Sequence, residues 1–485
     1  MTATTTTPPT LDTDYLVIGS GAVGMAFADT LFHETDARIV IVDRHHGPGG
    51  HWNDAYPFVR LHQPSAYYGV NSRPLGGDSR DTHTLNQVMC ERATAAEIVS
   101  YYEAVMQGFL ASGRVRYFPM SDCSGDDASG YRITSRLGGE AQPVSFSKKV
   151  VDTSYLNTAV PSTHPPKYAV APGLKCIPLN DLPKVKQAPS GYVVVGAGKT
   201  GIDACVWLLD NGVSPDAICW VMPRDSWFIN RANVQPGEEF FMQSIGGMAR
   251  QMACVAQAAS ADELLAQLEA HEQLLRLDPA VTPSMYHAAT VSQAELAALR
   301  SIRNVVRLGR VERIEADRIM LQQGSVPSDP QRLYVDCSAS AVEPRPAVPI
   351  FQGRKIVPQF VRAFQPTFSA ALVAHVEHLF DGSDADDVQK NQLCGVVPLP
   401  DTPLSWLSMQ AASMANMVRW SKTQGLGAWI AASRLDGFSR LTRNVDPADT
   451  AKLQVLQLFR ANAVPAAMKL PQLLAKAVAA GKPAA

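Results

Sequence analysis

Two glycine-rich fingerprints of the form Gly-x-Gly-x-x-Gly constrain this chain more than any other feature. The first is Gly19–Gly24 and the second is Gly196–Gly201, and each follows a short apolar run. In such a motif the first glycine permits a tight turn, the second lets the backbone approach a pyrophosphate, and the third lets the helix pack closely on the strand. The pyrophosphate lies at the helix N-terminus, where unpaired N–H groups favour an anion. Two such motifs predict a chain that holds two dinucleotides.

The first unit has an acid at the end of its second predicted strand. Residues 38–42 form this strand, and Asp43 follows it about 20 residues after the fingerprint, where a ribose-binding carboxylate is expected. We expect Asp43 to accept hydrogen bonds from ribose hydroxyls. Because a carboxylate repels a 2′-phosphate, the first site suits FAD or NAD.

The second unit lacks that acid. Its predicted second strand, 217–222, is followed by Pro223 and Arg224, and a guanidinium is well suited to a phosphate. Lys199 within the fingerprint adds positive charge, so the second site favours NADPH. Two alternatives stay open: Arg224 as a solvated surface residue, and an inward-turned Asp225 that would admit NADH.

Composition excludes several classes of protein. The 485 residues suffice for two or three domains, and the net charge of −2 gives no basic footprint for nucleic acid. No apolar run reaches the length of a membrane span, and the polar tail 1–11 lacks the regions of a signal peptide, so we expect a disordered tail and a cytoplasmic protein. The eight cysteines form no CxxC pair, which argues against a disulfide reductase.

A further motif follows Asp43, where the sequence reads Gly49-Gly50-x-Trp52. Together with the two fingerprints and Asp43, it resembles the flavin-containing monooxygenase superfamily over about residues 12–230. This superfamily includes N- and S-oxygenating enzymes and Baeyer–Villiger monooxygenases. The resemblance implies FAD in the first domain and NADPH in the second. It implies these cofactor-binding residues: Gly19, Gly21, Ala22, Val23, Gly24, Asp43, Arg44, Gly50, His51, Trp52, Gly196, Gly198, Lys199, Thr200, Gly201 and Arg224.

The predicted fold is α/β, with two Rossmann-like dinucleotide-binding domains and the NADPH domain inserted into the FAD domain. Residues 12–185 form the first part of the FAD domain, and 158–190 are a proline-rich crossing between domains. Residues 190–335 form the NADPH domain, with a helical insertion at about 240–303. Residues 336–485 return to the FAD domain and end in a tail that is either a docked helix or frayed.

The candidate catalytic residues lie shortly after the Gly-Gly-x-Trp segment. Aligned on Tyr56 and Arg60, His62 falls where relatives place an Asn or Asp beside the flavin, and a histidine there can donate a hydrogen bond or move a proton. Arg60 would place positive charge near the reduced flavin, and Gln63 is a further candidate. The alternatives are a structural histidine at 62, a local salt bridge for Arg60, and plain core packing for Trp52.

The resemblance implies an FAD- and NADPH-dependent monooxygenase that inserts one oxygen atom of O2 into a small organic substrate through a C4a-peroxyflavin. The family's Phe-x-Gly-x-x-x-His stretch is absent, and Val151–Tyr155 stands where an Ala-Thr-Gly linker is usual, so the type of oxygenation stays open. The alternatives are an NADPH oxidase or flavin reductase without oxygen insertion, and a nucleotide-binding flavoprotein that acts through partners. No metal-ligand spacing occurs. The oligomeric state is open, a homodimer included.

Overall fold

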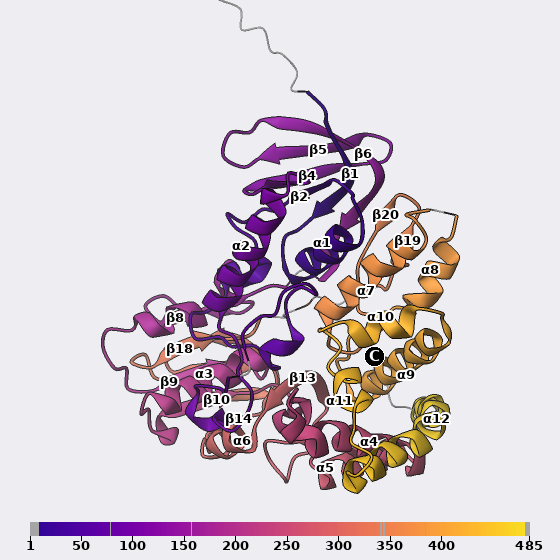
Figure 1. The fold of residues 1–485 in the computed structure, drawn as a ribbon. Coiled ribbons are helices and arrows are strands. Elements are labelled where there is room, and N and C mark those ends of the chain that lie inside the picture. The colour runs from indigo at the N-terminus through magenta and orange to yellow at the C-terminus, as the bar shows by residue number, and fades with distance from the viewer. Residues whose placement is uncertain are drawn as a thin grey trace, which may run out of the picture.

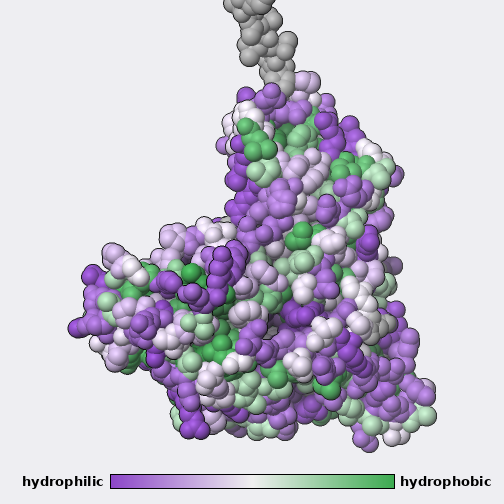
Figure 2. Space-filling model, turned by 90° about the vertical axis from the view of Figure 1, so that its left-hand side faces the viewer, coloured by the Kyte–Doolittle hydropathy of each residue, from purple (hydrophilic) through white to green (hydrophobic). Residues whose placement is uncertain are grey.

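The structure is a computed structural model, and it describes residues 9–77, 79–156, 158–339, 342, 345–383 and 385–480. Residues 1–8 of the expected disordered tail lie outside this range. Two sheets covered by helices, the first mixed and the second parallel, form the body of the molecule, and a set of C-terminal helices lies beside them (Figure 1). Figure 2 shows hydrophilic and hydrophobic residues mixed over one face of the molecule.

The first sheet has the strand order β19-β20-β6-β1-β2-β3, with β5 and β4 added as antiparallel strands beside β6. Helix α1 (Ala22–Glu34) connects β1 to β2, and α7 (Pro366–Leu379) packs against it. Helix α2 (Ala95–Ala111) begins at the capping box of Thr94 and Glu97, as the sequence predicts. The strands are β1 Leu11–Ile18, β2 Ile39–Val42, β3 Val115–Phe118, β4 Ser121–Asp126, β5 Gly130–Ser135, β6 Ala141–Asp152, β19 Phe351–Gln352 and β20 Lys355–Ile356.

The second sheet has the order β14-β10-β9-β18-β8 and is parallel throughout. Helix α3 (Lys199–Asp210) follows β9, and α6 (Gln293–Arg300) begins at the complete capping box of Ser292 and Glu295. The α/β class with two Rossmann-like units is therefore confirmed. The strands are β8 Lys175–Pro178, β9 Tyr192–Val195, β10 Ile218–Val221, β14 Val305–Val306 and β18 Leu333–Asp336.

Residues 158–190, expected to be a crossing between the domains, contain two short strands that pair with strands of the second domain. β8 completes the second sheet beside β18. β7 joins a small four-stranded sheet of order β17-β16-β15-β7. The prolines of this stretch do not prevent the two short strands. Each strand pairs with a partner that is distant in the sequence, so the local sequence gives little sign of it. The four strands are β7 Ala169–Val170, β15 Val311–Ile314, β16 Arg318–Leu321 and β17 Gly324–Pro327.

The stretch expected to be helical, 240–303, is only partly so. It holds α4 (Phe241–Gln257) and α5 (Ala261–Ala270), and then β12 (Leu274–Leu275) and β13 (Met285–Val291), which pair with β11 (Ser226–Asn230). The helical expectation was wrong for β12 and β13, where pairing with β11 decides the conformation. Leu264 and Leu268 are fully buried, as expected of a core stripe.

After β18 the chain returns to the first sheet through β19, β20 and α7. Of the remaining helices, α8 still contacts β19 and α7, and the chain then continues into α9. α9 and α12 pack with α4 and α5 of the insertion around a separate hydrophobic core, so the tail is a docked helix over its described length. These helices are α8 Asp387–Leu393, α9 Pro403–Lys422, α10 Leu426–Ala432, α11 Ser439–Arg443 and α12 Thr450–Ala479.

Short 3-10 turns connect these elements. They are η1 Gly50–Asp54, η2 Ser65–Tyr67, η3 Thr84–Asn86, η4 Thr153–Leu156, η5 Pro161–Thr163, η6 Leu179–Lys184, η7 Pro215–Ala217, η8 Arg231–Val234 and η9 Glu238–Phe240. The turn η1 directly follows Gly49, and η8 follows β11. The turns η1 and η8 lie close to the candidate site residues.

Candidate functional site

The first fingerprint forms a tight turn between β1 and α1. Gly19 has φ +104°, and a side chain at Gly24 would collide with the carbonyl oxygen of Gly19. Gly21 stands at the N-terminal end of α1, where no side chain caps the helix. The first N–H groups of α1 therefore have no side-chain partner in the described structure, which suits an anion.

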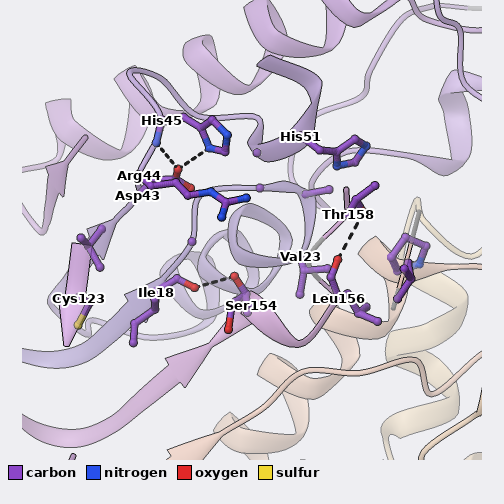
Figure 3. Close-up of a pocket in the computed structure, with 18 of the residues that line it drawn as sticks. Ile18, Val23, Asp43, Arg44, His45, His51, Cys123, Ser154, Leu156 and Thr158 are labelled. Atoms are coloured by element: carbon purple, nitrogen blue, oxygen red, sulfur yellow. Dashed lines mark hydrogen bonds and ion pairs between the residues drawn. The ribbon is translucent and has the colours of Figure 1, made fainter. Parts of the chain in front are cut away.

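A cavity of about 390 Å³ opens at this turn (Figure 3). It lies at the carboxyl ends of the first sheet, where ligands of open parallel sheets bind. Of the residues predicted for the first nucleotide, these line it: Gly19, Gly21, Ala22, Val23, Asp43, Arg44, Gly50 and His51. Sequence reasoning missed its other polar or charged lining residues, although several directly follow β3 or β6: His45, Tyr68, Ser121, Asp122, Thr153, Ser154 and Thr158.

Gly50 brings a second piece of backbone against the fingerprint. It has φ +57°, and a Cβ built on it would lie 2.9 Å from the Cα of Gly21. Only glycine allows this approach without a shift of one chain. Trp52 and Gly24 do not line the cavity. The Trp52 ring is buried and donates from Nε1 to the hydroxyl of Tyr68 at 2.7 Å, which places Trp52 in the wall behind the cavity.

Asp43 is buried beside the turn and is held by two neighbours. Its Oδ2 accepts from the hydroxyl of Ser20 at 2.9 Å, and its Oδ1 lies 2.8 Å from Nδ1 of His45. The other ring nitrogen of His45 lies 3.0 Å from Asp54. Burial by itself raises the pKa of Asp43, but hydrogen bonds from His45 and Ser20 together hold it below its usual value. Asp43 therefore stays a carboxylate at the position where the sequence predicts a contact with ribose.

His51 carries no charge at neutral pH in this cavity. Burial lowers its pKa to about 4, and the charge of His45 adds to the effect. Its ring points toward the cavity in Figure 3 and lies 4.8 Å from the ring of Trp52. A neutral imidazole there presents one donor and one acceptor to a bound group.

The second fingerprint repeats the geometry of the first. Gly196 has φ +133°, and a side chain at Gly201 would collide with the carbonyl oxygen of Gly196. Gly198 begins α3 without a side-chain cap, and Thr200 lies in the first turn of that helix. The Nε1 of Trp220 donates to the Gly196 carbonyl at 2.8 Å and fixes the turn. The α3 N-terminus therefore has the same construction as that of α1 and likewise suits an anion.

Lys199 lies at the boundary between the two domains. Its ammonium is ion-paired with Asp203, one helical turn further along α3. The same carboxylate oxygen accepts from the hydroxyl of Tyr56 at 2.6 Å. Burial lowers the pKa of Lys199 against the opposing effect of Asp203. The side chain expected to add charge at a phosphate is thus directed toward the segment that contains Tyr56.

His62 also lies at this boundary, outside the residues that line the cavity. Its carbonyl oxygen accepts a hydrogen bond from Arg231, and its Nδ1 is buried without a protein partner. Burial lowers the pKa of His62 well below its usual value, and the charges of Lys199 and Arg231 lower it further. The imidazole is therefore neutral at physiological pH, which leaves it a hydrogen-bonding role. The half-buried Gln63 follows it.

Arg60 faces a different set of partners. Its guanidinium donates to the carbonyl of Arg92 at 3.2 Å and to the hydroxyl of Thr82 at 3.1 Å, and it lies 3.9 Å from Asp81. These contacts match the local salt bridge that the sequence left open. Arg60 is not among the residues that line the cavity.

Sequence reasoning missed the buried arginine that joins the domains, Arg231. It donates to Glu295 at 2.8 Å and to the carbonyl of Thr290 at 2.6 Å, besides its contact with His62. Charge from Arg231 and Arg92 holds the pKa of Glu295 at about 2, although burial opposes this. The only sign of this role in the sequence was that Arg231 is a charged residue directly after the mostly apolar strand β11.

Arg224 lies just past the carboxyl end of β10, where the sequence predicts contact with a phosphate. Its nearest charged partner is Asp401, at 3.7 Å. Asp225 does not turn toward a ribose site, because Arg307 binds both its carboxylate oxygens at 2.8 and 3.1 Å. The acid that would have admitted NADH is thus neutralised within the protein.

Two absences concern the described residues alone. Among them, no group of three or more His, Cys, Asp or Glu side chains is placed to hold a metal ion. Within the same part of the chain, no helix is both long and apolar enough to cross a membrane.

Fold and site together define a protein with two Rossmann units joined through one buried boundary. A family model described as an NAD(P)-binding Rossmann-like domain matches residues 17–70, which contain the first fingerprint, Asp43 and Gly50. Uncharacterized proteins from Mycobacterium tuberculosis and Mycobacterium bovis are 46% identical over 471 residues, which cover 97% of this chain and 86% of each relative. The chain belongs to the same family as these mycobacterial proteins.

Solved structures with a similar course of the chain carry little sequence identity. A steroid monooxygenase bound to NADP is 13% identical, with 98% of both chains covered and a TM-score of 0.49. A cyclohexanone monooxygenase from Rhodococcus sp. Phi1 bound to NADP+ is 13% identical, with the same coverage and a TM-score of 0.48. A flavin-containing monooxygenase from Stenotrophomonas maltophilia is 13% identical over 74% of this chain and 89% of its own, with a TM-score of 0.42.

Proposed function

We propose that this chain is an FAD- and NADPH-dependent monooxygenase that inserts one oxygen atom of O2 into a small organic substrate. One observation carries the proposal: the single segment 50–63 touches both nucleotide sites. Gly50 and His51 line the cavity of the first fingerprint, and Tyr56 binds Asp203 on the helix of the second. Two dinucleotides bound at these sites would thus contact one continuous piece of chain.

The residues present fit FAD in the first cavity. The glycine pair Gly21 and Gly50 forms a cradle that a Cβ would fill, and the uncapped α1 N-terminus offers N–H donors for the pyrophosphate. Asp43, ionised and fixed by His45, would accept from the ribose. When bound, FAD supplies the hydride acceptor and the reactivity toward O2.

The second site fits NADPH. The turn at Gly196 repeats the pyrophosphate site, and Arg224 presents a guanidinium beyond β10 while Arg307 neutralises Asp225. Lys199, Tyr56 and Asp203 would then hold the two domains in register. His62, neutral and with a free Nδ1 toward the boundary, would offer a hydrogen bond to the reacting oxygen.

The deciding experiment measures product mass. The purified protein is incubated with NADPH, O2 and a panel of amines, sulfides, ketones and aromatics, while NADPH consumption and hydrogen peroxide are followed in parallel. A gain of one oxygen atom in any substrate supports the proposal. Consumption of NADPH with an equal yield of hydrogen peroxide across the panel would instead identify an NADPH oxidase. Protein without flavin, and not reconstituted by FAD, would point to a role through partners.

A further inference from the structure

Asp401 reaches from the C-terminal part of the chain onto the second Rossmann domain. It lies just before α9, and its Oδ1 is 2.5 Å from Nε2 of His287 and 3.7 Å from the guanidinium of Arg224. The Asp401 side chain is 52% exposed, and those of Arg224 and His287 are 39% and 42% exposed. One carboxylate oxygen thus faces two basic side chains at the surface.

A third basic side chain acts on the same carboxylate. Burial by itself raises the pKa of Asp401, but His287, Arg224 and Arg310 together hold it below its usual value. Arg310 follows β14, the neighbour of β10 in the second sheet. Asp401 therefore lies between Arg224, just past the carboxyl end of β10, and His287 on β13.

The backbone of Asp401 is fixed while its side chain is not enclosed. Its carbonyl accepts from the backbone N–H of Tyr286 at 3.0 Å, and its own N–H donates to the hydroxyl of Ser405 at 2.9 Å. The next residue, Thr402, caps α9. The carboxylate can therefore turn away from Arg224 without unfolding the segment that carries it.

Asp401, Arg224 and His287 lie where a Rossmann domain binds the adenosine end of its nucleotide. In a Rossmann domain the end of the second strand faces the adenosine ribose, and an arginine there accommodates a 2′-phosphate. Asp225, the acid nearest in sequence, is already bound by Arg307. Asp401 is consequently the carboxylate that meets Arg224, in the place where the phosphate of NADPH would bind.

We propose that Asp401 is an internal counter-ion that occupies the 2′-phosphate site and lowers the preference of the protein for NADP(H) over NAD(H). Arg224 and His287 would bind the phosphate once the carboxylate turns aside. The inference rests on the proposed use of NADPH. A nucleotide with the phosphate must break the contacts of Asp401 and then sits beside its charge, whereas one without the phosphate leaves them intact.

The test is calorimetric titration of the purified protein with NADP+ and, separately, with NAD+. Asp401→Asn keeps the size of the side chain and removes its charge. We expect this variant to bind NADP+ about 3- to 10-fold more tightly, the range that loss of a surface ion pair and a like-charge repulsion gives. Binding of NAD+ should stay unchanged. In about 0.5 M salt the gain should shrink, because exposed charges are screened.

Three controls separate the site from a change in net charge. Asp401→Glu keeps the charge and should not tighten NADP+ binding. Asp317→Asn removes an exposed carboxylate paired with Arg318 on the turn between β15 and β16, and it should leave both nucleotides unaffected. His287→Gln should weaken NADP+ binding and spare NAD+. Unchanged or weaker NADP+ binding by Asp401→Asn overturns the proposal, as does an equal gain from Asp317→Asn or no binding of NADP+ to any variant.

The outcome is independent of oxygen insertion. Tighter NADP+ binding by Asp401→Asn together with no oxygenated product would uphold the counter-ion and reject the monooxygenase. An oxygenated product together with an unchanged NADP+ affinity would do the reverse.

Discussion

The hydroxyl of Tyr56 lies 2.6 Å from the carboxylate of Asp203, and this hydrogen bond joins the two Rossmann domains. Tyr56 is buried and Asp203 is half-buried, and Lys199 shares the same carboxylate oxygen. Burial and the charge of Asp203 raise the pKa of Tyr56 well above its usual value, so the phenol keeps its proton and acts as the donor. The contact lies between the cavity of the first fingerprint and the helix of the second.

Tyr56→Phe removes the hydrogen bond between the two domains and should lower both the stability of the protein and the rate of flavin reduction. A buried hydrogen bond contributes about 1 kcal/mol to the free energy of unfolding, and the variant should lose about that amount in urea denaturation. It should also slow anaerobic flavin reduction by NADPH. The matched control is Tyr15→Phe, which removes a buried bond of 3.3 Å to Glu377 within the first domain. Tyr15→Phe should lower stability alone, and equal slowing of reduction by both variants would contradict the assignment.

Gly21→Leu should abolish flavin binding. A Cβ at Gly21 would already lie 3.5 Å from the Cα of Gly50, and a full leucine side chain would extend into the cavity. The absorbance of bound flavin measures the effect, and circular dichroism checks the fold. The control is Gly108→Leu on the exposed side of α2, where nothing lies within 4 Å of a built Cβ. A yellow Gly21→Leu protein would show that FAD binds elsewhere.

Arg224→Ala should weaken NADPH binding and leave NADH binding nearly unchanged. Charge-assisted contacts to a phosphate are worth about 1.5–3 kcal/mol, or about 10- to 100-fold in affinity. Steady-state kinetics with both nucleotides measure the change. Arg318→Ala, which removes another exposed arginine of the same domain, is the control. If Arg224→Ala keeps the preference for NADPH over NADH, another residue binds the phosphate. His287 and Arg310 would then be the next candidates, because Lys199 is held by Asp203.

The ion pair of Asp43 and His45 predicts a pH-dependent stability. The hydrogen bond to Asp43 raises the pKa of His45 against the effect of burial. Its stabilising contribution is therefore complete below the ordinary histidine pKa of about 6.5 and is lost as the pH rises through the raised value. Melting temperatures between about pH 5 and pH 9 should fall less steeply at the alkaline side for His45→Gln than for the wild type.

The lowered pKa of Asp43 acts at the opposite end of the pH range. Its contribution is present above the ordinary value of about 3.9 and is lost as the pH falls through the lowered value. The control for the His45→Gln variant is His271→Gln, which replaces an exposed histidine. Its melting temperature should follow that of the wild type in parallel over the same pH range. Parallel curves for His45→Gln as well would refute the assigned role of the ion pair.

Local patterns in the sequence sufficed for the parts of this protein that depend on neighbouring residues. The turn at Gly19 and the acid Asp43 follow from spacing alone, because a tight turn and a strand end are local features. β8 could not be predicted, since its strand character comes from pairing with β18 about 160 residues later in the chain. Arg224 was predicted but its partner Asp401 was not, because the fold alone brings the two together.

The directions in which side chains point could not be predicted from the sequence either. Lys199 belongs to the fingerprint, yet it points to Asp203 and the boundary between the domains. The sequence left open whether His62 donates a hydrogen bond or moves a proton. Burial and the charges of Lys199, Arg231 and Arg92 lower the pKa of its imidazole well below the usual value, and neither effect can be judged from the sequence around it.

His62→Ala should affect the reaction with oxygen and leave flavin reduction nearly intact. The imidazole is neutral and its Nδ1 has no protein partner, so it can offer a hydrogen bond to the reacting oxygen, whereas hydride transfer needs only nicotinamide stacked on flavin. Loss of one preorganised donor costs about 100- to 1,000-fold in the step that it serves. The variant should therefore release more hydrogen peroxide per NADPH and form less oxygenated product.

Stopped-flow measurement of each half-reaction separates this role from a structural one. Because the pKa of His62 is well below its usual value, the oxygen half-reaction of the wild type should show no titration of His62 between about pH 6 and pH 8. His62→Asn keeps a donor of similar reach and should recover part of the lost coupling, while His62→Ala does not. Equal slowing of both half-reactions, or no change in either, would make His62 a structural residue whose carbonyl serves Arg231.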